Sequence, residues 1–267
     1  ILTGNISLES IKKNITKKTK GVIIVHMAGY PCEVDKILNF CKKKKIVLLE
    51  DCAHAVGTKF KKKHVGNFGV SGSFSFYPTK QITTGEGGMV ITNDYNFYKK
   101  IKSLKAFGID KDIKDRKKQG DYDVKSLGFN YRMTDFQAAL GLNQIVKYKK
   151  NLRQRHLIAK RYIKNFINNK KINHMPYSKN CSFFIFQIFC KNRDKILKEL
   201  KNKNIGVSVH YSNALPKMTY YKKKYNLNID KFKNADNYGC TNISLPVYPK
   251  LKMTEVDKIC KTIISLI

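Results

Sequence analysis

The chain has 267 residues, 42% of them apolar, so it can bury a substantial core and is not a disordered polypeptide. Lysine and arginine number 53 against 19 acidic residues, which gives a formal charge of +34. The lysines stand in runs such as residues 42–45 and 222–224, without arginine forks or a regular aromatic partner. A solvated lysine-rich surface is therefore favoured over a nucleic-acid interface.

The seven cysteines show no zinc-like spacing, which indicates free thiols in a reducing cytoplasm and no metal site. The longest aromatic and apolar run, residues 181–190, is too short to cross a bilayer and is interrupted by Gln187, so no membrane span is expected. Because the chain opens on Ile1 rather than methionine, we expect it to be N-terminally incomplete.

The first predicted unit is a βαβ crossover. Residues 21–26 and 46–51 are short apolar strands, and residues 33–44 between them carry apolar side chains at helical spacing. Parallel strands joined in this way are expected to be buried on both faces of the sheet.

Two further short strands, 72–76 and 87–93, flank a Thr-Gly-Glu-Gly turn. A helix is expected over residues 94–104. Residues 108–128 have no sustained apolar period and predict a long excursion, the kind of loop that is usually functional or contacts a partner.

Thr134 and Gln137 have the spacing of a capping box, and a long basic helix is predicted from there to about Asn168. The remainder predicts strand 182–189, helix 193–203, a strand over residues 206–211 and a last helix from near residue 254. We therefore expect a larger α/β domain over residues 1–133, and a linking helix with a small α+β C-terminal domain over residues 134–267.

A group of chemically active side chains is expected at the strand ends. Asp51 ends a parallel strand, where the ligand crevices of open α/β sheets lie, although alone it could equally cap the next segment. His54 follows three residues later and could be a packing residue. Strand alternation turns Ser75 away from the neighbouring phenylalanines, and Lys80 follows the strand. A carboxylate, a ring, a hydroxyl and a lysine suit an aldehyde cofactor held as a Schiff base.

Five segments in order, residues 22–37, 48–58, 64–93, 128–145 and 243–259, together resemble the DegT/StrS family of nucleotide-sugar aminotransferases that depend on pyridoxal 5′-phosphate (PLP). The resemblance covers essentially the whole chain. It implies the fold of type I PLP-dependent transferases, an α/β fold with a mostly parallel sheet in a large PLP-binding domain and a smaller α+β C-terminal domain. The family's further N-terminal segment, with a phosphate-binding turn and a ring-stacking aromatic residue, precedes the point where this chain begins.

The resemblance also implies roles for individual residues. Lys80 matches the lysine that forms the internal aldimine and shuttles the proton, and Asp51 matches the partner of the pyridine nitrogen. His54 stands where the family has Gln or His near the cofactor ring and its O3′. Ser75 matches a phosphate-binding serine. Asn130 matches an asparagine that reaches the phosphate of the neighbouring subunit, which implies a homodimer with shared active sites.

Three more residues are open to two interpretations. His210 and Tyr211 resemble a segment near the sugar-nucleotide pocket, but as residues at the end of a predicted strand they could equally be packing residues. His26 could face the strand-end crevice or have a structural role.

The activity that the resemblance implies is a cytoplasmic, ping-pong transfer of an amino group from glutamate, through PLP and its pyridoxamine form, to the keto group of a nucleotide-linked deoxysugar. Amino sugars of this kind supply polysaccharide biosynthesis. Lys80 argues against a sugar dehydratase of the same fold, in which histidine replaces the lysine. Two alternatives are a catalytically silent family member that acts as a binding or regulatory subunit, and a nucleic-acid-binding protein driven by charge.

Overall fold

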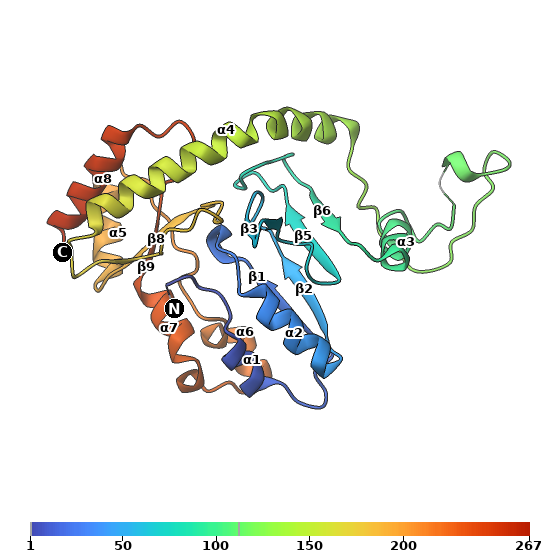
Figure 1. The fold of residues 1–267 in the computed structure, drawn as a ribbon, viewed down its shortest axis with the longest axis horizontal. Coiled ribbons are helices and arrows are strands. Elements are labelled where there is room, and N and C mark those ends of the chain that lie inside the picture. The colour runs from blue at the N-terminus through green and yellow to red at the C-terminus, as the bar shows by residue number, and fades with distance from the viewer. Residues whose placement is uncertain (1, 112) are drawn as a thin grey trace.

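The computed structural model describes residues 2–111 and 113–267 (Figure 1). A short helix, α1 (Leu8–Asn14), precedes a four-stranded sheet of order β1-β2-β5-β6. Its strands are β1 (Gly21–Val25), β2 (Val47–Asp51), β5 (Ser71–Ser75) and β6 (Gly88–Ile91). The first three strands run parallel and β6 is antiparallel to β5, so the sheet is mostly parallel, as predicted.

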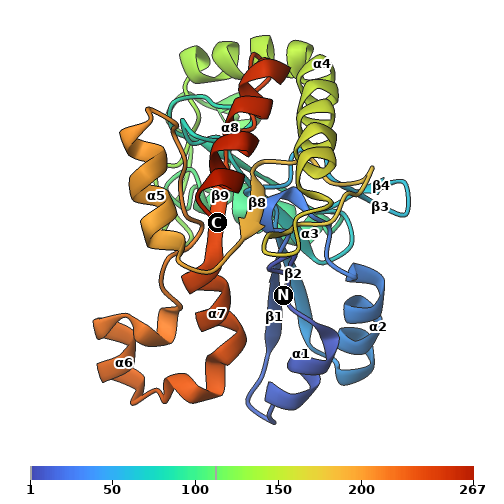
Figure 2. The ribbon, with the colours of Figure 1, turned by 90° about the vertical axis from the view of Figure 1, so that its left-hand side faces the viewer.

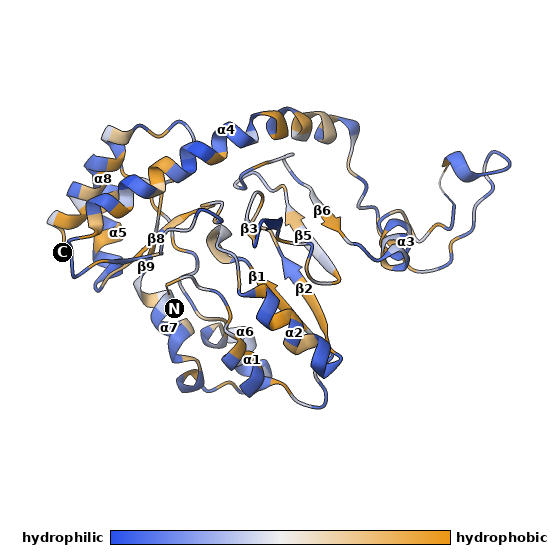
Figure 3. Ribbon diagram, viewed as in Figure 1, coloured by the Kyte–Doolittle hydropathy of each residue, from blue (hydrophilic) through white to orange (hydrophobic). Residues whose placement is uncertain are grey.

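The predicted βαβ crossover is present, with α2 (Val34–Lys44) connecting β1 to β2. The fully buried Ile37 of α2 packs in one core cluster with Ile24 of β1 and Leu48 of β2. The expectation that both faces of these strands are buried is wrong for the described part of the chain. Ile23 on the opposite face is 64% exposed, because α2 covers one face only, and Figure 3 shows how apolar β1 is.

The segment between β2 and β5 contains a small hairpin that the sequence did not predict, β3 (Lys59–Phe60) with β4 (Lys63–His64). The helix after β6 was predicted and is α3 (Tyr95–Leu104), capped by the Asp94 side chain. The predicted excursion follows α3 and contains one short 3₁₀ turn, η2 (Ile113–Asp115). It projects away from the rest of the molecule (Figure 1).

The long helix α4 (Asp135–Phe166) begins at the predicted capping box, in which Thr134 accepts from the backbone of Gln137. Its first half runs beside the large sheet, and its second half enters the C-terminal part of the molecule (Figure 1). There its buried residues Tyr162 and Phe166 join the largest core cluster. The helix therefore runs from the large sheet into the C-terminal core.

The C-terminal part is built on an antiparallel sheet of order β7-β8-β9, made of β7 (Asn173–His174), β8 (Phe186–Phe189) and β9 (Asn242–Leu245). Figure 2 shows α5 and α8 beside this sheet, and α6 and α7 below them. The bounds of these helices, with the remaining 3₁₀ turns, are α5 (Arg193–Asn202), η3 (Leu215–Lys217), α6 (Thr219–Tyr225), η4 (Ile229–Phe232), α7 (Lys233–Thr241), α8 (Met253–Ser265) and η1 (Met27–Gly29).

Two strand predictions need correction. The strand expected at 182–189 begins only at Phe186, because the preceding residues form a buried loop. Residues 206–211 form no strand and make a single bridge, between Ser208 and Ser244. Two residues further on, the backbone N–H of His210 donates to the side chain of Asn242 instead of continuing a ladder.

The domain boundary at residues 133 and 134 stays a prediction. The large C-terminal core also includes Met27 and Ala28, which follow β1, so the two parts are packed on each other. No helix in residues 2–111 and 113–267 is long and apolar enough to span a membrane.

Candidate active site

Asp51 is the last residue of β2, with Val25 of β1 and Ser73 of β5 beside it in register. One of its carboxylate oxygens accepts from the backbone N–H of Ala53 at 2.9 Å, so Asp51 does cap a local turn. The other oxygen has no hydrogen-bond partner in the part of the chain that the structure describes. Asp51 therefore keeps one free acceptor at the carboxyl edge of the sheet.

Lys80 lies in a turn after β5, closed by a hydrogen bond from its own backbone N–H to the carbonyl of Tyr77. Its Nζ atom lies 5.0 Å from the ring centroid of Phe184 and forms no ion pair within the described residues. Burial lowers the pKa of the Lys80 amine, while the negative charge of Asp51 raises it by a smaller amount. A larger share of this amine is consequently neutral than for an ordinary lysine.

His54 lies next to this amine and stacks on the same phenylalanine. The ring centroids of His54 and Phe184 are 4.2 Å apart, with an angle of 23° between the planes. The His54 side chain is only 5% exposed, and its Nδ1 atom is buried without a hydrogen-bond partner. Burial, with the nearby charges of Lys80 and His210, lowers the pKa of His54 to about 3, so the ring is neutral at neutral pH.

Phe184 was not identified from the sequence, because it stands in an apolar run that gives no chemical signal. Its loop is held by backbone hydrogen bonds from Phe184 to Ala28 and from Ser182 to Gly29. Gly29 has a φ of 83°, and a Cβ atom there would lie 2.3 Å from the Ser182 hydroxyl. The close approach of these two segments requires glycine, and it brings the Phe184 ring against both Lys80 and His54.

The structure also brings His210 and Tyr211 to this edge. The His210 ring makes an edge contact with His54, at 6.5 Å between centroids, and its Nδ1 atom lies 2.9 Å from the Ser244 hydroxyl. Burial and the charge of Lys80 lower the pKa of His210. Burial and the charge of Asp51 raise the pKa of Tyr211. Both residues thus share the electrostatic environment of the crevice.

Ser75 and Asn130 differ in position. Ser75 is the last residue of β5, and its hydroxyl accepts from the backbone N–H of Tyr77 at 3.3 Å. Asn130 belongs to the end of the excursion, where it bridges to Ala106 and accepts from Arg132 at 3.3 Å. The fold brings Ser75, and not Asn130, to the strand ends that carry Asp51.

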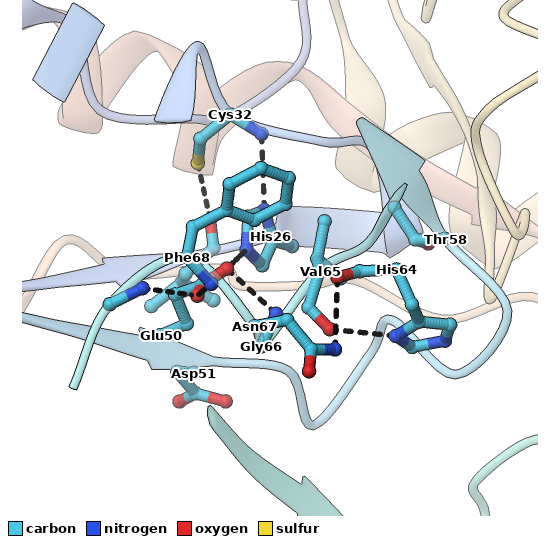
Figure 4. Close-up of polar contacts among 12 residues, drawn as sticks. His26, Cys32, Glu50, Asp51, Thr58, His64, Val65, Gly66, Asn67 and Phe68 are labelled. Carbon is cyan, nitrogen blue, oxygen red and sulfur yellow. Dashed lines mark hydrogen bonds and ion pairs between the residues drawn. The ribbon is translucent and has the colours of Figure 1, made fainter. Parts of the chain in front are cut away.

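His26 has a structural role, one of the two open interpretations. It is fully buried, and its Nε2 atom lies 3.1 Å from Glu50, while its Nδ1 accepts from the backbone N–H of Cys32 (Figure 4). Glu50 also accepts from three backbone N–H groups, those of Gly66, Phe68 and Gly69.

Cys52 lies close enough to this pair for the three side chains to resemble a metal site. Both ring nitrogens of His26 and both oxygens of Glu50 are already engaged in hydrogen bonds, however. Burial, followed by the charge of Glu50, raises the pKa of the Cys52 thiol far above its ordinary value, so the thiol is neutral beside this pair. The cluster is therefore a satisfied structural network.

Comparison with known proteins agrees with this geometry. The model of the DegT/DnrJ/EryC1/StrS aminotransferase family matches residues 1–264. GDP-perosamine synthase of Escherichia coli O157:H7 is 34% identical over 265 residues, which cover 98% of this chain and 69% of that protein.

Solved structures give the same result. PseC of Helicobacter pylori, an aminotransferase of pseudaminic acid biosynthesis, superposes with a TM-score of 0.92 at 30% identity, over 99% of this chain and 71% of that one. The sugar aminotransferase Spr1654 of Streptococcus pneumoniae has a TM-score of 0.90 in its pyridoxamine phosphate (PMP) form, at 28% identity over 98% and 73% of the two chains. The fold class expected from the sequence is confirmed, and the chain belongs to the DegT/DnrJ/EryC1/StrS aminotransferase family.

Proposed function

We propose that the protein is a PLP-dependent aminotransferase that transfers an amino group from glutamate to the keto group of a nucleotide-linked sugar. The observation that carries this proposal is the Lys80 amine, which has a lowered pKa and lies beside Asp51 and His54 at the carboxyl edge of the sheet. The family supplies the class of enzyme. The names of the relatives, a GDP-perosamine synthase and a transaminase of a UDP-linked amino sugar in Campylobacter jejuni, support a nucleotide-linked sugar as the acceptor.

The polar groups of the crevice fit PLP. His54 has a buried ring nitrogen without a partner, Asp51 has a free carboxylate oxygen, and the Lys80 amine is unpaired among the described residues. A buried polar atom without a partner is costly, so a ligand that supplies one is favoured. We assign the pyridine nitrogen to Asp51, the ring edge and O3′ to His54, and the phosphate to Ser75. PLP, when bound, supplies an electron sink for the carbanion formed at the donor's α-carbon.

The residues around the cofactor have separate tasks in this proposal. With PLP bound, the neutral share of the Lys80 amine would be the nucleophile toward its aldehyde carbon, whose oxygen leaves as water, and Nζ would carry the proton removed from the donor's α-carbon. The Asp51 carboxylate keeps the pyridine nitrogen protonated. His54 stays neutral, because its pKa is lowered to about 3, and therefore adds no second cation beside Lys80.

The proposal of a homodimer with shared sites is supported by the position of Asn130, which bridges to Ala106 at the end of the excursion and has no hydrogen bond to the strand ends of its own chain among the described residues. The same segment and the start of α4 expose large apolar side chains, including Leu127 at 84%, Phe136 at 82% and Val146 at 83%. An exposed apolar surface of this kind is typical of an interface between subunits. We propose that this surface docks a second copy and that Asn130 reaches the partner's phosphate site.

A cytoplasmic location and a role in polysaccharide biosynthesis complete the proposal. All seven cysteines are free thiols, as expected in a reducing compartment. SpsC of Bacillus subtilis, 33% identical, is named as a spore coat polysaccharide biosynthesis protein. A silent binding subunit is less favoured, since Lys80, Asp51 and His54 form a site that such a protein would not need.

The test is an absorbance spectrum of the full chain with PLP, recorded before and after addition of glutamate. We expect a visible band of the lysine-bound cofactor that declines with glutamate, and no such band in Lys80→Ala. Lys63→Ala, which removes an exposed lysine that also lies over a ring, is the matched control and should behave as the wild type. A wild-type chain that gives no band would refute the enzyme proposal and favour the silent subunit.

A further inference from the structure

The loop that carries Phe184 is held by a buried arginine of α4. Arg155 donates through its Nη1 atom to the carbonyl oxygens of Phe183 at 3.1 Å and Phe184 at 3.2 Å. The same atom donates to the carbonyl of Val247, beyond the end of β9, at 2.6 Å. Arg155 is buried, and hydrogen bonds from a charged donor are about twice as strong as those between neutral groups. Arg155 therefore ties the loop both to α4 and to the segment after β9.

Arg155 is buried without an acidic partner, in contrast to Arg161 on the same helix. Arg161 pairs with Asp257 of α8, at 2.6 Å from its Nε atom. Within residues 2–111 and 113–267, Arg155 forms no ion pair and its Nε atom has no hydrogen-bond partner. Burying a guanidinium is costly, and an apolar side chain would pack α4 without that cost. What the charged side chain adds over an apolar one is its hydrogen bonds to the loop.

The loop requires such support because its backbone is strained. Phe183 has a φ of 46°, in the left-handed region, which costs a residue other than glycine about 1–2 kcal/mol. The fully buried Phe183 ring makes an edge contact with His156 of α4, at 5.1 Å between centroids. The next ring, that of Phe184, lies against Lys80 instead. A strained residue persists only where its surroundings fix it, and the bonds from Arg155 are part of that fixation.

The same helix also fixes the other side of the ring stack. Tyr148 lies two turns before Arg155 on the same face of α4, and its hydroxyl donates to the carbonyl of Val56. Val56 follows His54 by two residues. The turn that carries His54 and the loop that carries Phe184 are thus both attached to one helix, which runs from the large sheet into the C-terminal core (Figure 1).

We propose that Arg155 is a positioning residue for Lys80, because it holds the Phe184 ring where the ring keeps water away from the amine. Among the described residues, the charged and titratable groups that face Lys80 are Asp51, His54 and His210, and Arg155 is not one of them. Arg155 consequently acts through the loop and not through its charge. Its part in amine transfer rests on the proposed function, in which the neutral Lys80 amine reacts.

The test is trace acetylation of the cofactor-free full chain over a pH series, with modification at Lys80 compared with the exposed Lys63 by peptide mass spectrometry. Arg155→Met removes the hydrogen bonds to the loop and keeps a long apolar side chain, whereas Arg155→Lys keeps a cationic donor. Arg161→Met and Arg161→Lys are the matched controls. They make the same substitutions on the same helix, at an arginine whose partner lies on α8.

We expect Arg155→Met to reduce the neutral share of Lys80 by about three-fold or more at a fixed pH, because water reaches the amine once the ring is no longer held. Arg155→Lys should lie between this variant and the wild type. Both Arg161 variants should lower the unfolding temperature and leave the Lys80 profile unchanged. In a Phe184→Ala background, Arg155→Met should change the profile little further, because two substitutions that act through one ring are not additive.

Thermal unfolding verifies that each variant is folded, and if Arg155→Met does not fold, the comparison of Arg155→Lys with Arg161→Lys replaces it. An unchanged Lys80 profile in the folded Arg155 variants would overturn the proposal, as would an equal change in the Arg161 variants. A full further change on adding Arg155→Met to Phe184→Ala would overturn it as well, since Arg155 would then act by another route.

The glutamate-dependent decline of the PLP band in the wild type separates these outcomes from failure of the proposed function. A chain that shows the decline but has an unchanged Lys80 profile in the Arg155 variants is an aminotransferase in which Arg155 does not position the amine. A chain that shows no band but has the expected Lys80 profiles would refute the proposed function and support the positioning role of Arg155.

Discussion

The Phe184 ring has two opposite effects on the Lys80 amine, and two substitutions separate them. The ring excludes water, which disfavours the charged amine, and burial lowers the pKa of Lys80 by more than the charge of Asp51 raises it. The ring face at 5.0 Å also attracts the ammonium form. Phe184→Leu keeps most of the exclusion of water and removes the attraction, whereas Phe184→Ala removes both.

The expected magnitudes follow from these two effects. A cation–π contact at a partly exposed site contributes about 0.5–1 kcal/mol, which corresponds to a change of about two- to five-fold in the protonation equilibrium. Phe184→Leu should therefore increase the ratio of neutral to charged Lys80 by that factor at any given pH. Phe184→Ala should change it in the opposite direction, because water reaches the amine and the pKa rises toward the ordinary lysine value.

The assay is trace acetylation of the cofactor-free protein over a pH series, with the extent of modification at Lys80 read by peptide mass spectrometry. The exposed Lys63 in the same digest serves as the internal reference, and the unfolding temperature of each variant verifies its fold. Identical Lys80 profiles in the wild type and both variants would show that Phe184 does not control this amine. A rise in pKa for both variants would show that exclusion of water is the only effect of the ring.

Two further predictions concern the scaffold under the site. Glu50→Gln should lower the free energy of unfolding by about 1.5–3 kcal/mol in denaturant titrations, because the amide replaces a charged acceptor of buried hydrogen bonds and leaves at least one buried N–H group unpaired. Burial alone would raise the pKa of Glu50, but the hydrogen bonds from His26 and three backbone N–H groups outweigh it and lower the pKa. The stability that Glu50 contributes is therefore complete above the unfolded carboxyl pKa of about 4.3, and it is lost as the pH falls through the lower folded pKa. An equally steep loss of stability in acid for Glu50→Gln would contradict this reasoning. Gly29→Ala should destabilise more than Gly85→Ala. Both have positive φ, which costs about 1–2 kcal/mol for alanine, but only at Gly29 would the new Cβ meet neighbouring atoms, Ser182 Oγ at 2.3 Å and the His54 carbonyl oxygen at 2.9 Å. Equal loss in the two thermal melts would mean that the Ser182 loop moves freely.

The parts of the fold that were predictable have a strong local pattern. The βαβ crossover and the capping box at Thr134 depend on residues a few positions apart, and both are present as predicted. The strand expected at residues 206–211 has a similar alternation of apolar and polar residues but no partner strand beyond Ser208. There the pattern arises because Val207 packs on the core, whereas the His210 ring contacts His54 in the crevice.

In the candidate site, too, the residues with local sequence signals were predictable and those placed by long-range contacts were not. Asp51, His54 and Lys80 belong to one stretch of chain around parallel strands, so strand-end geometry and the family motif placed them together from the sequence. Phe184 lies in a loop that is held by hydrogen bonds between residues more than 100 positions apart, such as Gln81 and Ser182. No local pattern encodes such a contact.

These long-range contacts act on the amine on which the proposed function depends. Amine transfer requires a lysine that is partly neutral, and burial supplies this by lowering the pKa of Lys80. The chain assembles the crevice from β2, the turn after β5 and the loop that carries Phe184. Because that loop is held by contacts with residues far away in the sequence, a change in it should alter the Lys80 amine while β2 and Asp51 stay in place.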